Sequence, residues 1–211
     1  MDPTTPPGAI VVLGLGNVLW ADEGFGVRCV EALTERYVLP AAVSVLDGGT
    51  QGLYLLPYIR AANQLLIFDA VDYGLPAGTL HCVRDAEVPR FLGAKKLSLH
   101  QTGFQEVLAL AELTGRYPRQ ILLVGCQPEV LDDFGGSLRP LLRAALEPAL
   151  SLGLAELASW GVDVSPRSAA SADASCLGLT RYEAERPSEA AAFRGGDPRF
   201  LPLSAADAEE R

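Results

Sequence analysis

Short, unbroken apolar runs alternate along the chain with segments in which apolar residues recur every three or four positions. Unbroken runs rich in Val, Ile and Leu are typical of strands buried on both faces of a parallel sheet. Such runs occur at 9–14, 43–46, 64–68 and 120–124. A weaker alternation of apolar and polar residues at 79–84 predicts an edge strand.

Helical spacing occurs between these runs. It predicts helices at about 27–37, 52–62, 104–111 and 138–149. The first helix is expected to end before Pro40, because proline disfavours helical geometry in the residue before it. Ser137 stands where it can cap the last helix, and Pro148 is expected to kink that helix.

Strands that alternate with helices predict an α/β fold. We expect residues 9–165 to form a single domain, with a twisted, mostly parallel five-stranded sheet and helices on both faces. Residues 1–8 are expected to be a flexible N-terminal leader segment. Residues 166–211 contain neither Val nor Ile, so this tail is predicted to be disordered.

Composition and charge limit the possible functions. Of the 211 residues, 49% are hydrophobic and 20% are charged, which is typical of a soluble globular protein. Seventeen Lys and Arg against 26 Asp and Glu give a net charge of −9, which disfavours binding to nucleic acid. No apolar run approaches the roughly 18 residues that predict membrane insertion. Four widely spaced cysteines suit a reducing cytoplasm rather than a disulfide framework or a thiolate zinc site.

Two carboxylates follow predicted strands. Asp22 and Glu23 lie in the glycine-rich loop after the first strand, where Asp22 can cap the next helix but Glu23 has no such structural role. Asp69 comes directly after the third strand. If the first and third strands are neighbours, Glu23 and Asp69 face one cleft at the carboxyl end of the sheet, where α/β proteins bind ligands. Asp72 is expected to form a turn with Gly74.

Histidine and cysteine positions complete the set of candidate residues. His100 is predicted to lie in a loop before a helix, whereas His81, in the edge strand, has the commoner role of a hydrogen-bonded surface or core residue. Glu23, Asp69 and His100 together would make an open ligand set for a divalent first-row metal ion. Cys126 ends a strand, but a buried small apolar residue is the favoured interpretation. No serine nucleophile is suggested by the pattern.

Four ordered motifs resemble those of the [NiFe]-hydrogenase maturation proteases, and the resemblance is strongest to the branch that serves uptake hydrogenases. They are Gly-x-Gly-Asn-x-Leu-x-x-Asp-Glu-Gly-x-Gly at 14–26, Asp-Gly-Gly-Thr-Gln-Gly at 47–52, Phe-Asp-Ala-Val-Asp-Tyr-Gly at 68–74 and Ser-Leu-His-Gln-Thr-Gly at 98–103. The resemblance extends over about residues 10–162.

This resemblance implies an endopeptidase, of the carboxylate-dependent or aspartyl type, that removes a C-terminal extension from the hydrogenase large-subunit precursor after nickel insertion. It also implies that Glu23, Asp69 and His100 bind metal. Carboxylate and imidazole ligands suit Ni²⁺, which the precursor itself would supply. Nickel could take part in catalysis or could only position the peptide. The loop formed by Asp47, Gly48, Gly49 and Thr50 could hold the substrate peptide through backbone N–H groups, or be an ordinary turn.

Two other functions share some of these features. A nickel-dependent assembly chaperone would use the same ligands without cutting the precursor. A peptidyl-tRNA hydrolase also resembles a strand followed by Gly-Leu-Gly-Asn, but it needs a histidine soon after that motif and a basic face for tRNA. Here the first histidine is His81 and the net charge is negative. The tail at 166–211 could be a passive end or a docking segment for other hydrogenase assembly factors.

Overall fold

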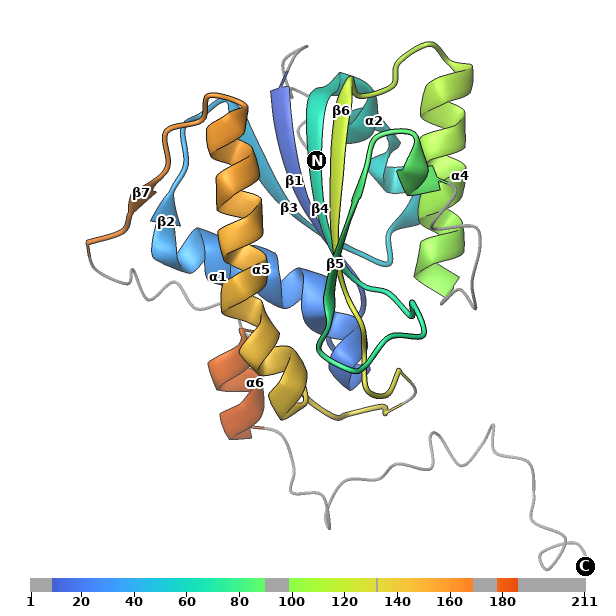
Figure 1. The fold of residues 1–211 in the computed structure, drawn as a ribbon. Coiled ribbons are helices and arrows are strands. Elements are labelled where there is room, and N and C mark those ends of the chain that lie inside the picture. The colour runs from blue at the N-terminus through green and yellow to red at the C-terminus, as the bar shows by residue number, and fades with distance from the viewer. Residues whose placement is uncertain (1–8, 90–98, 132, 169–177, 186–211) are drawn as a thin grey trace, which may run out of the picture.

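Five strands form one twisted sheet that is parallel except at one edge (Figure 1). The computed structural model describes residues 9–89, 99–131, 133–168 and 178–185. The strands, in spatial order, are β3 (Val43–Gly49), β1 (Ala9–Leu15), β4 (Ala62–Ala70), β6 (Gln120–Cys126) and β5 (Leu80–Arg84). Only β5 is antiparallel to its neighbour in this sheet. The predicted α/β fold and the predicted edge strand are confirmed.

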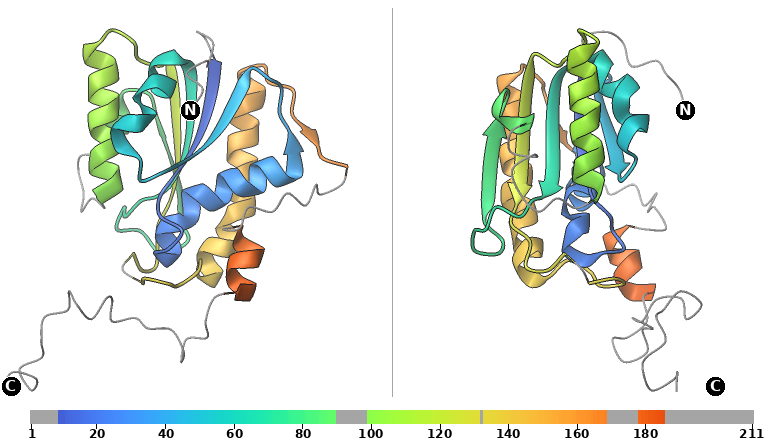
Figure 2. Two further views of the ribbon diagram at one scale, coloured as in Figure 1. Left: turned by 180° about the vertical axis from the view of Figure 1, so that it is seen from behind. Right: turned by 90° about the vertical axis from the view of Figure 1, so that its right-hand side faces the viewer.

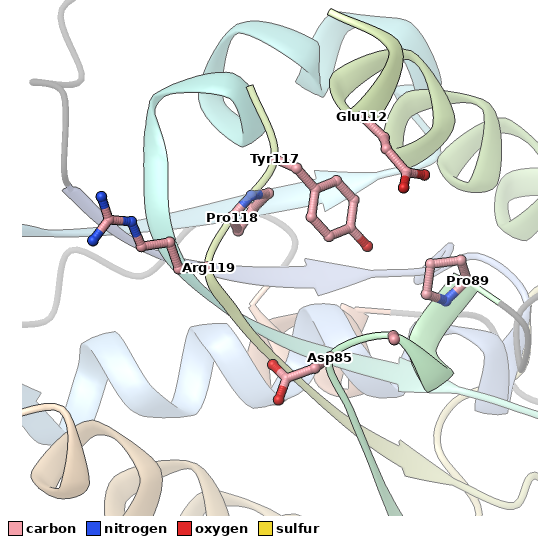
Figure 3. Close-up of a pocket in the computed structure, with 7 residues that line it drawn as sticks. Asp85, Pro89, Glu112, Tyr117, Pro118 and Arg119 are labelled. Atoms are coloured by element: carbon pink, nitrogen blue, oxygen red, sulfur yellow. The ribbon is translucent and has the colours of Figure 1, made fainter. Parts of the chain in front are cut away.

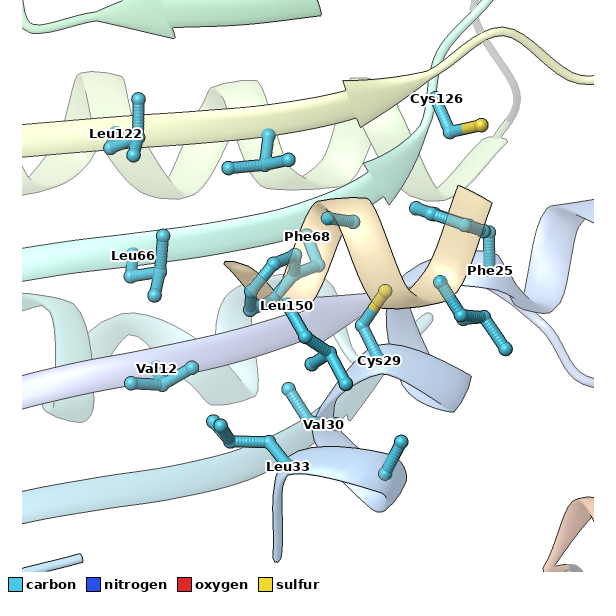
Figure 4. Close-up of a cluster of buried hydrophobic side chains, with 14 of the residues drawn as sticks. Val12, Phe25, Cys29, Val30, Leu33, Leu66, Phe68, Leu122, Cys126 and Leu150 are labelled. Carbon is cyan, nitrogen blue, oxygen red and sulfur yellow. The ribbon is translucent and has the colours of Figure 1, made fainter. Parts of the chain in front are cut away.

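Helices cover both faces of the sheet (Figure 2). One face packs against α1 (Phe25–Arg36) and α5 (Pro140–Ser159), and the other against α2 (Leu56–Ala61) and α4 (Leu99–Leu113). Successive strand residues point to opposite faces, so Val12 contributes to the first core and Val11 to the second. Figure 4 shows the first core, in which Phe68 and Leu150 pack beside Cys29.

The carboxyl ends of the four parallel strands meet at one edge of the sheet, hereafter the carboxyl edge. Two short 3₁₀ helices follow there, η1 (Ala21–Gly24) after β1 and η2 (Gly52–Leu55) after β3. A separate two-stranded ribbon joins β2 (Tyr37–Val38) to β7 (Ser165–Pro166). None of the helices in the described residues is long and apolar enough to cross a membrane.

The start of the last long helix differs from the prediction. Helix α5 begins at Pro140 and its cap residue, Arg139, makes no side-chain capping hydrogen bond. The hydroxyl of Ser137 instead donates a hydrogen bond to Glu183, so the prediction that Ser137 caps this helix is wrong. Pro148 lies inside α5 and does not end it.

The C-terminal segment also differs from the expectation of a disordered tail. Helix α6 (Leu179–Glu185) lies within it. Figure 1 shows α6 at the end of the molecule where α5 begins. Leu179 of this helix packs against the first core, and Tyr182 and Glu183 form hydrogen bonds with the chain just before α5. The expectation for residues 1–8 lies outside the described residues.

A glycine at the start of α1 allows this helix to approach the sheet closely. A Cβ atom added at Gly26 would lie 2.1 Å from the carbonyl oxygen of Phe68 and 2.4 Å from that of Leu15. Both atoms belong to the backbone of central strands and cannot move independently. Helix α1 could therefore accept a side chain here only by shifting away from β1 and β4.

We expect Gly26→Ala to destabilise the protein by about 1–3 kcal/mol, because overpacking outweighs the gain in helix propensity. Urea denaturation measures the change. Gly103→Ala is the matched control, because an added Cβ in α4 meets only the Gly52 Cα at 3.5 Å. Gly103→Ala should leave the free energy of unfolding unchanged or raise it. Equal stability of Gly26→Ala and the unmodified protein would contradict the close approach.

Candidate functional site

Glu23 is placed at the carboxyl edge by a tight turn after β1. Gly16 has a φ of +124°, and a Cβ there would lie 1.8 Å from the Glu23 carbonyl oxygen. Only glycine allows the chain to fold back this closely. The backbone N–H of Glu23 donates to the Trp20 carbonyl at 3.0 Å, which closes the first turn of η1. The Glu23 side chain is half-buried.

Asp69 lies inside β4 rather than after it, because β4 extends to Ala70. Its side chain is fully buried, and its backbone is in register with Gly125 of β6. Strands β1 and β4 are neighbours, as the sequence argument required, and η1 packs against β4. The structure therefore brings the segments that carry Glu23 and Asp69 together at the carboxyl edge.

His100 lies in the first turn of α4 rather than in a loop before it. Near this end of α4, Gly103 packs on Gly52 of η2, so the His100 backbone is also at the carboxyl edge. The His100 side chain is outside the described residues. Among the side chains that the structure does describe, no three His, Cys, Asp or Glu residues are grouped so that they could hold a metal ion.

Asp22 has a different role from the predicted helix cap. It is fully buried, and neither η1 nor α1 has a side-chain cap. Its carboxylate accepts hydrogen bonds from the backbone N–H groups of Glu129, Val130 and Arg139 at 3.0, 3.2 and 2.9 Å. Asp22 thus ties the loop between β6 and α5 to η1. The cap prediction is wrong because the donors that reach this carboxylate lie more than 100 residues away in the sequence.

The predicted Asp47–Thr50 loop begins inside β3, because the strand continues to Gly49, and its contacts are those of a strand-to-helix turn. The Gly49 N–H donates to the Asp47 carboxylate at 2.9 Å, and Gln51 N–H donates to the Gly48 carbonyl at 3.1 Å. Burial raises the pKa of the Asp47 carboxyl, although the Gly49 hydrogen bond and the charge of Arg28 act in the opposite direction. The loop also lies beside the β1 turn, because the Gly49 carbonyl accepts a hydrogen bond from Gly16 N–H.

A polar network lies after β4 and β6. Asp72 accepts a hydrogen bond from the Gly74 N–H at 2.9 Å, which confirms its predicted turn. Buried Gln127 accepts from the Tyr73 N–H at 2.6 Å and donates to Asp72 at 3.0 Å. Burial, and after it the Asp69 charge, raises the pKa of the Tyr73 phenol. Tyr73 is therefore a protonated hydroxyl near Asp69 that the sequence argument missed.

The two buried thiols in the described residues, Cys29 and Cys126, are not arranged as nucleophiles. Cys126 is fully buried, which confirms the interpretation as a small apolar residue. Burial, with a smaller effect of the Asp22 charge, raises the pKa of the Cys126 thiol to about 12. Burial likewise raises the pKa of Cys29. The thiolate, which is the reactive form, is therefore scarce at neutral pH in both residues.

A pocket of about 450 Å³ lies at the opposite edge of the sheet (Figure 3). Its lining includes Asp85, Glu112, Tyr117 and Pro118, the last two of which come just before β6 begins. The length of the parallel strands separates this pocket from the carboxyl edge. It is therefore not part of the site that contains Glu23 and Asp69.

Comparison with known proteins identifies the family. Residues 27–156 match the family model described as hydrogenase maturation protease. The chain is 60% identical over 198 residues to the hydrogenase expression/formation protein HoxM of Cupriavidus necator, covering 92% of this chain and 98% of that protein. It is 62% identical over 194 residues to the hydrogenase expression/formation protein HupM of Azotobacter chroococcum, covering 91% and 93%.

A solved structure shares the fold. The hydrogenase maturating endopeptidase HybD of Escherichia coli superposes with a TM-score of 0.72 at 44% identity, covering 76% of this chain and 98% of its own. The sequence match, the sheet order and the structural match all indicate the same family. The chain therefore belongs to the hydrogenase maturation protease family and is a hydrolase.

Proposed function

We propose that this protein is the endopeptidase that removes the C-terminal extension of a [NiFe]-hydrogenase large-subunit precursor after nickel insertion. Membership of the family supports the reaction class. The observation that carries the proposal to particular residues is the pairing of β1 with β4, which brings the Glu23 and Asp69 segments to one edge. The net charge of −9 favours a protein substrate over a nucleic acid.

Nickel is proposed to enter the site as part of the precursor. Glu23, Asp69 and His100 would hold it, because two carboxylates and an imidazole form an open donor set that leaves positions for substrate ligands. In that position nickel would either polarise the scissile carbonyl or only anchor the peptide. The position of all three residues in segments at the carboxyl edge supports this proposal.

The protein's own side chains have separable roles in this proposal. Asp69 is fully enclosed and fixed within a strand, so it suits holding rather than proton transfer. Glu23 is half-buried and reachable by water, so we assign it the role of accepting a proton from the attacking water. The exposed Thr50 side of the Asp47–Thr50 loop is where the precursor peptide would lie. Processing would take place in the cytoplasm, where free thiols such as those of Cys29 and Cys126 stay reduced.

Incubation with nickel-loaded and with nickel-free precursor tests the proposal. We expect a shortened product, identified by its mass, only from the nickel-loaded form, because the three ligands would recognise nickel in the substrate. Binding of the loaded precursor without shortening would indicate an assembly chaperone instead. Equal cleavage of both forms would contradict the role of nickel, and absence of both binding and cleavage would contradict the substrate.

A further inference from the structure

The loop between β6 and α5 is held against η1 and the turn before it by hydrogen bonds. Besides the three hydrogen bonds to Asp22, the Gly135 N–H donates to the Leu19 carbonyl at 2.8 Å. Arg139 pairs with Asp133 of the same loop at 2.9 Å. Gly136 packs so closely that an added Cβ would be 2.9 Å from the Ala21 Cβ. This loop is therefore held in one position relative to Glu23.

The fixed loop presents apolar side chains to solvent. Phe134 is 45% exposed and packs edge-to-face against Trp20, with ring centroids 5.3 Å apart. Leu19, next to Trp20, is 41% exposed. We name Leu19, Trp20 and Phe134 the aromatic corner. Exposed aromatic side chains held in one arrangement are typical of protein interfaces, because little conformational entropy is lost on binding.

Exposed apolar residues are concentrated at the carboxyl edge. Among the described residues, nine large apolar side chains are exposed, and five of them lie in loops or short helices at this edge: Leu19, Leu53, Tyr54, Leu75 and Phe134. The aromatic corner is thus continuous with the candidate site, since Trp20 is followed directly by η1. A protein that places a peptide at Glu23 would contact this surface.

Helix α6 supports the same loop from the other side. The Tyr182 hydroxyl donates to the Gly136 carbonyl at 3.2 Å, and Glu183 accepts hydrogen bonds from Ser137 and from Arg143. The buried Arg28 guanidinium lies 5.5 Å from the centre of the Tyr182 ring. Seven residues are too few for a stable isolated helix, so these contacts hold α6 in place.

Some relatives match more of this chain than others do. The Escherichia coli endopeptidase is matched over 98% of its length, yet about a quarter of this chain has no counterpart in it. The match to HoxM covers 92% of this chain and therefore includes most of the residues after α5.

We propose that the aromatic corner, supported by α6, is a docking surface for the folded body of the large-subunit precursor. The inference rests on the proposed function for the identity of the partner. The corner would pack against an apolar patch that lies beside the precursor's metal centre, while the carboxylates receive the segment to be cut. Docking through a surface outside the reacting groups mainly affects substrate affinity rather than the chemical step.

Processing kinetics with nickel-loaded precursor test the docking surface. We expect Phe134→Ser to raise KM by about tenfold with kcat changed less than about twofold, as for a residue at the centre of an interface. Leu113→Ser is the matched control, because Leu113 is 83% exposed at the far end of α4. Unchanged KM for Phe134→Ser, or an equal effect of both variants, would overturn the proposal.

The role of α6 is tested at Tyr182. We expect Tyr182→Ala to raise KM by about fivefold without lowering kcat, because the loop loses the hydrogen bond from the Tyr182 hydroxyl and α6 also loses the ring that lies over Arg28. Tyr182→Phe loses the hydrogen bond but keeps the ring over Arg28, so its KM should lie between those of Tyr182→Ala and the unmodified protein. Ala184→Ser, an exposed change on the same helix, is the control. A fall in kcat for Tyr182→Ala at unchanged KM would show general damage instead and would overturn the positioning role.

Binding measurements separate this proposal from the proposed function. The Glu23→Gln variant, which should not cut the precursor, is compared with the double variant Glu23→Gln, Phe134→Ser, so that any effect of the Glu23 substitution on binding is common to both. A roughly tenfold higher Kd for the double variant supports the docking surface even if the unmodified protein cuts no precursor. Cleavage by the unmodified protein together with equal Kd values overturns the docking surface and leaves the proposed function standing.

Discussion

Replacement of Glu23 by glutamine, or of Asp69 by asparagine, is expected to lower the rate of precursor processing by about a thousandfold. Both substitutions keep the shape of the side chain and remove its negative charge. Glu23→Gln removes the group assigned to accept a proton from water, and Asp69→Asn weakens the proposed nickel ligand enclosed in β4. Mass spectrometry of the precursor after incubation measures the rate.

The fold must remain intact for this result to concern chemistry. Circular dichroism and the thermal denaturation midpoint of each variant check it. Glu112→Gln is the control, because Glu112 is exposed on α4 and lines the pocket at the opposite edge of the sheet. The control should process precursor normally. Normal processing by Glu23→Gln or by Asp69→Asn would remove that residue from the site.

Asp22→Ala is expected to lower the free energy of unfolding by about 3–5 kcal/mol. The substitution leaves three backbone N–H groups without their acceptor and removes the carboxylate that faces Arg139, whose Nη1 lies 3.7 Å away. A loss of this size is a large part of the roughly 5–15 kcal/mol that stabilises an ordinary domain. Urea denaturation measures it.

Two further variants show whether the hydrogen bonds cause this loss. Asp22→Asn keeps one acceptor oxygen and should be less destabilised than Asp22→Ala. Asp163→Ala, at an exposed acid after α5, should change stability by less than about 0.5 kcal/mol. If Asp22→Ala were as stable as Asp163→Ala, the carboxylate would not be what ties the loop before α5 to η1.

Local sequence patterns were sufficient to predict the strands and to predict that the segments carrying the candidate acids lie close together. A run such as 64–68 is apolar at nearly every position, so it predicts a strand covered on both faces whatever the rest of the chain does. Strand β4 is that run with two residues added at each side. Because parallel strands end at one edge, the positions of Glu23 and Asp69 after or near strand ends implied a shared location.

Side-chain partners could not be predicted in the same way. Asp22 and Ser137 have the residue types and positions of helix caps, and their sequence neighbours allow that role. In the folded chain the backbone N–H of Glu129 reaches Asp22, and the carboxylate of Glu183 reaches Ser137. These partners are 107 and 46 residues away, so no local pattern contains them.

The sequence by itself determined the class of fold, the order of its strands along the chain and the family, and it predicted the acids of the candidate site. It did so because apolar runs, the spacing of apolar residues and ordered motifs can each be recognised in short stretches of the chain. The tertiary structure alone decided that Asp22 binds the loop before α5 rather than capping a helix, and that Tyr73 lies near Asp69. It also decided that α6 forms where a disordered tail was expected. Each of these depends on groups that only the folded chain brings close together.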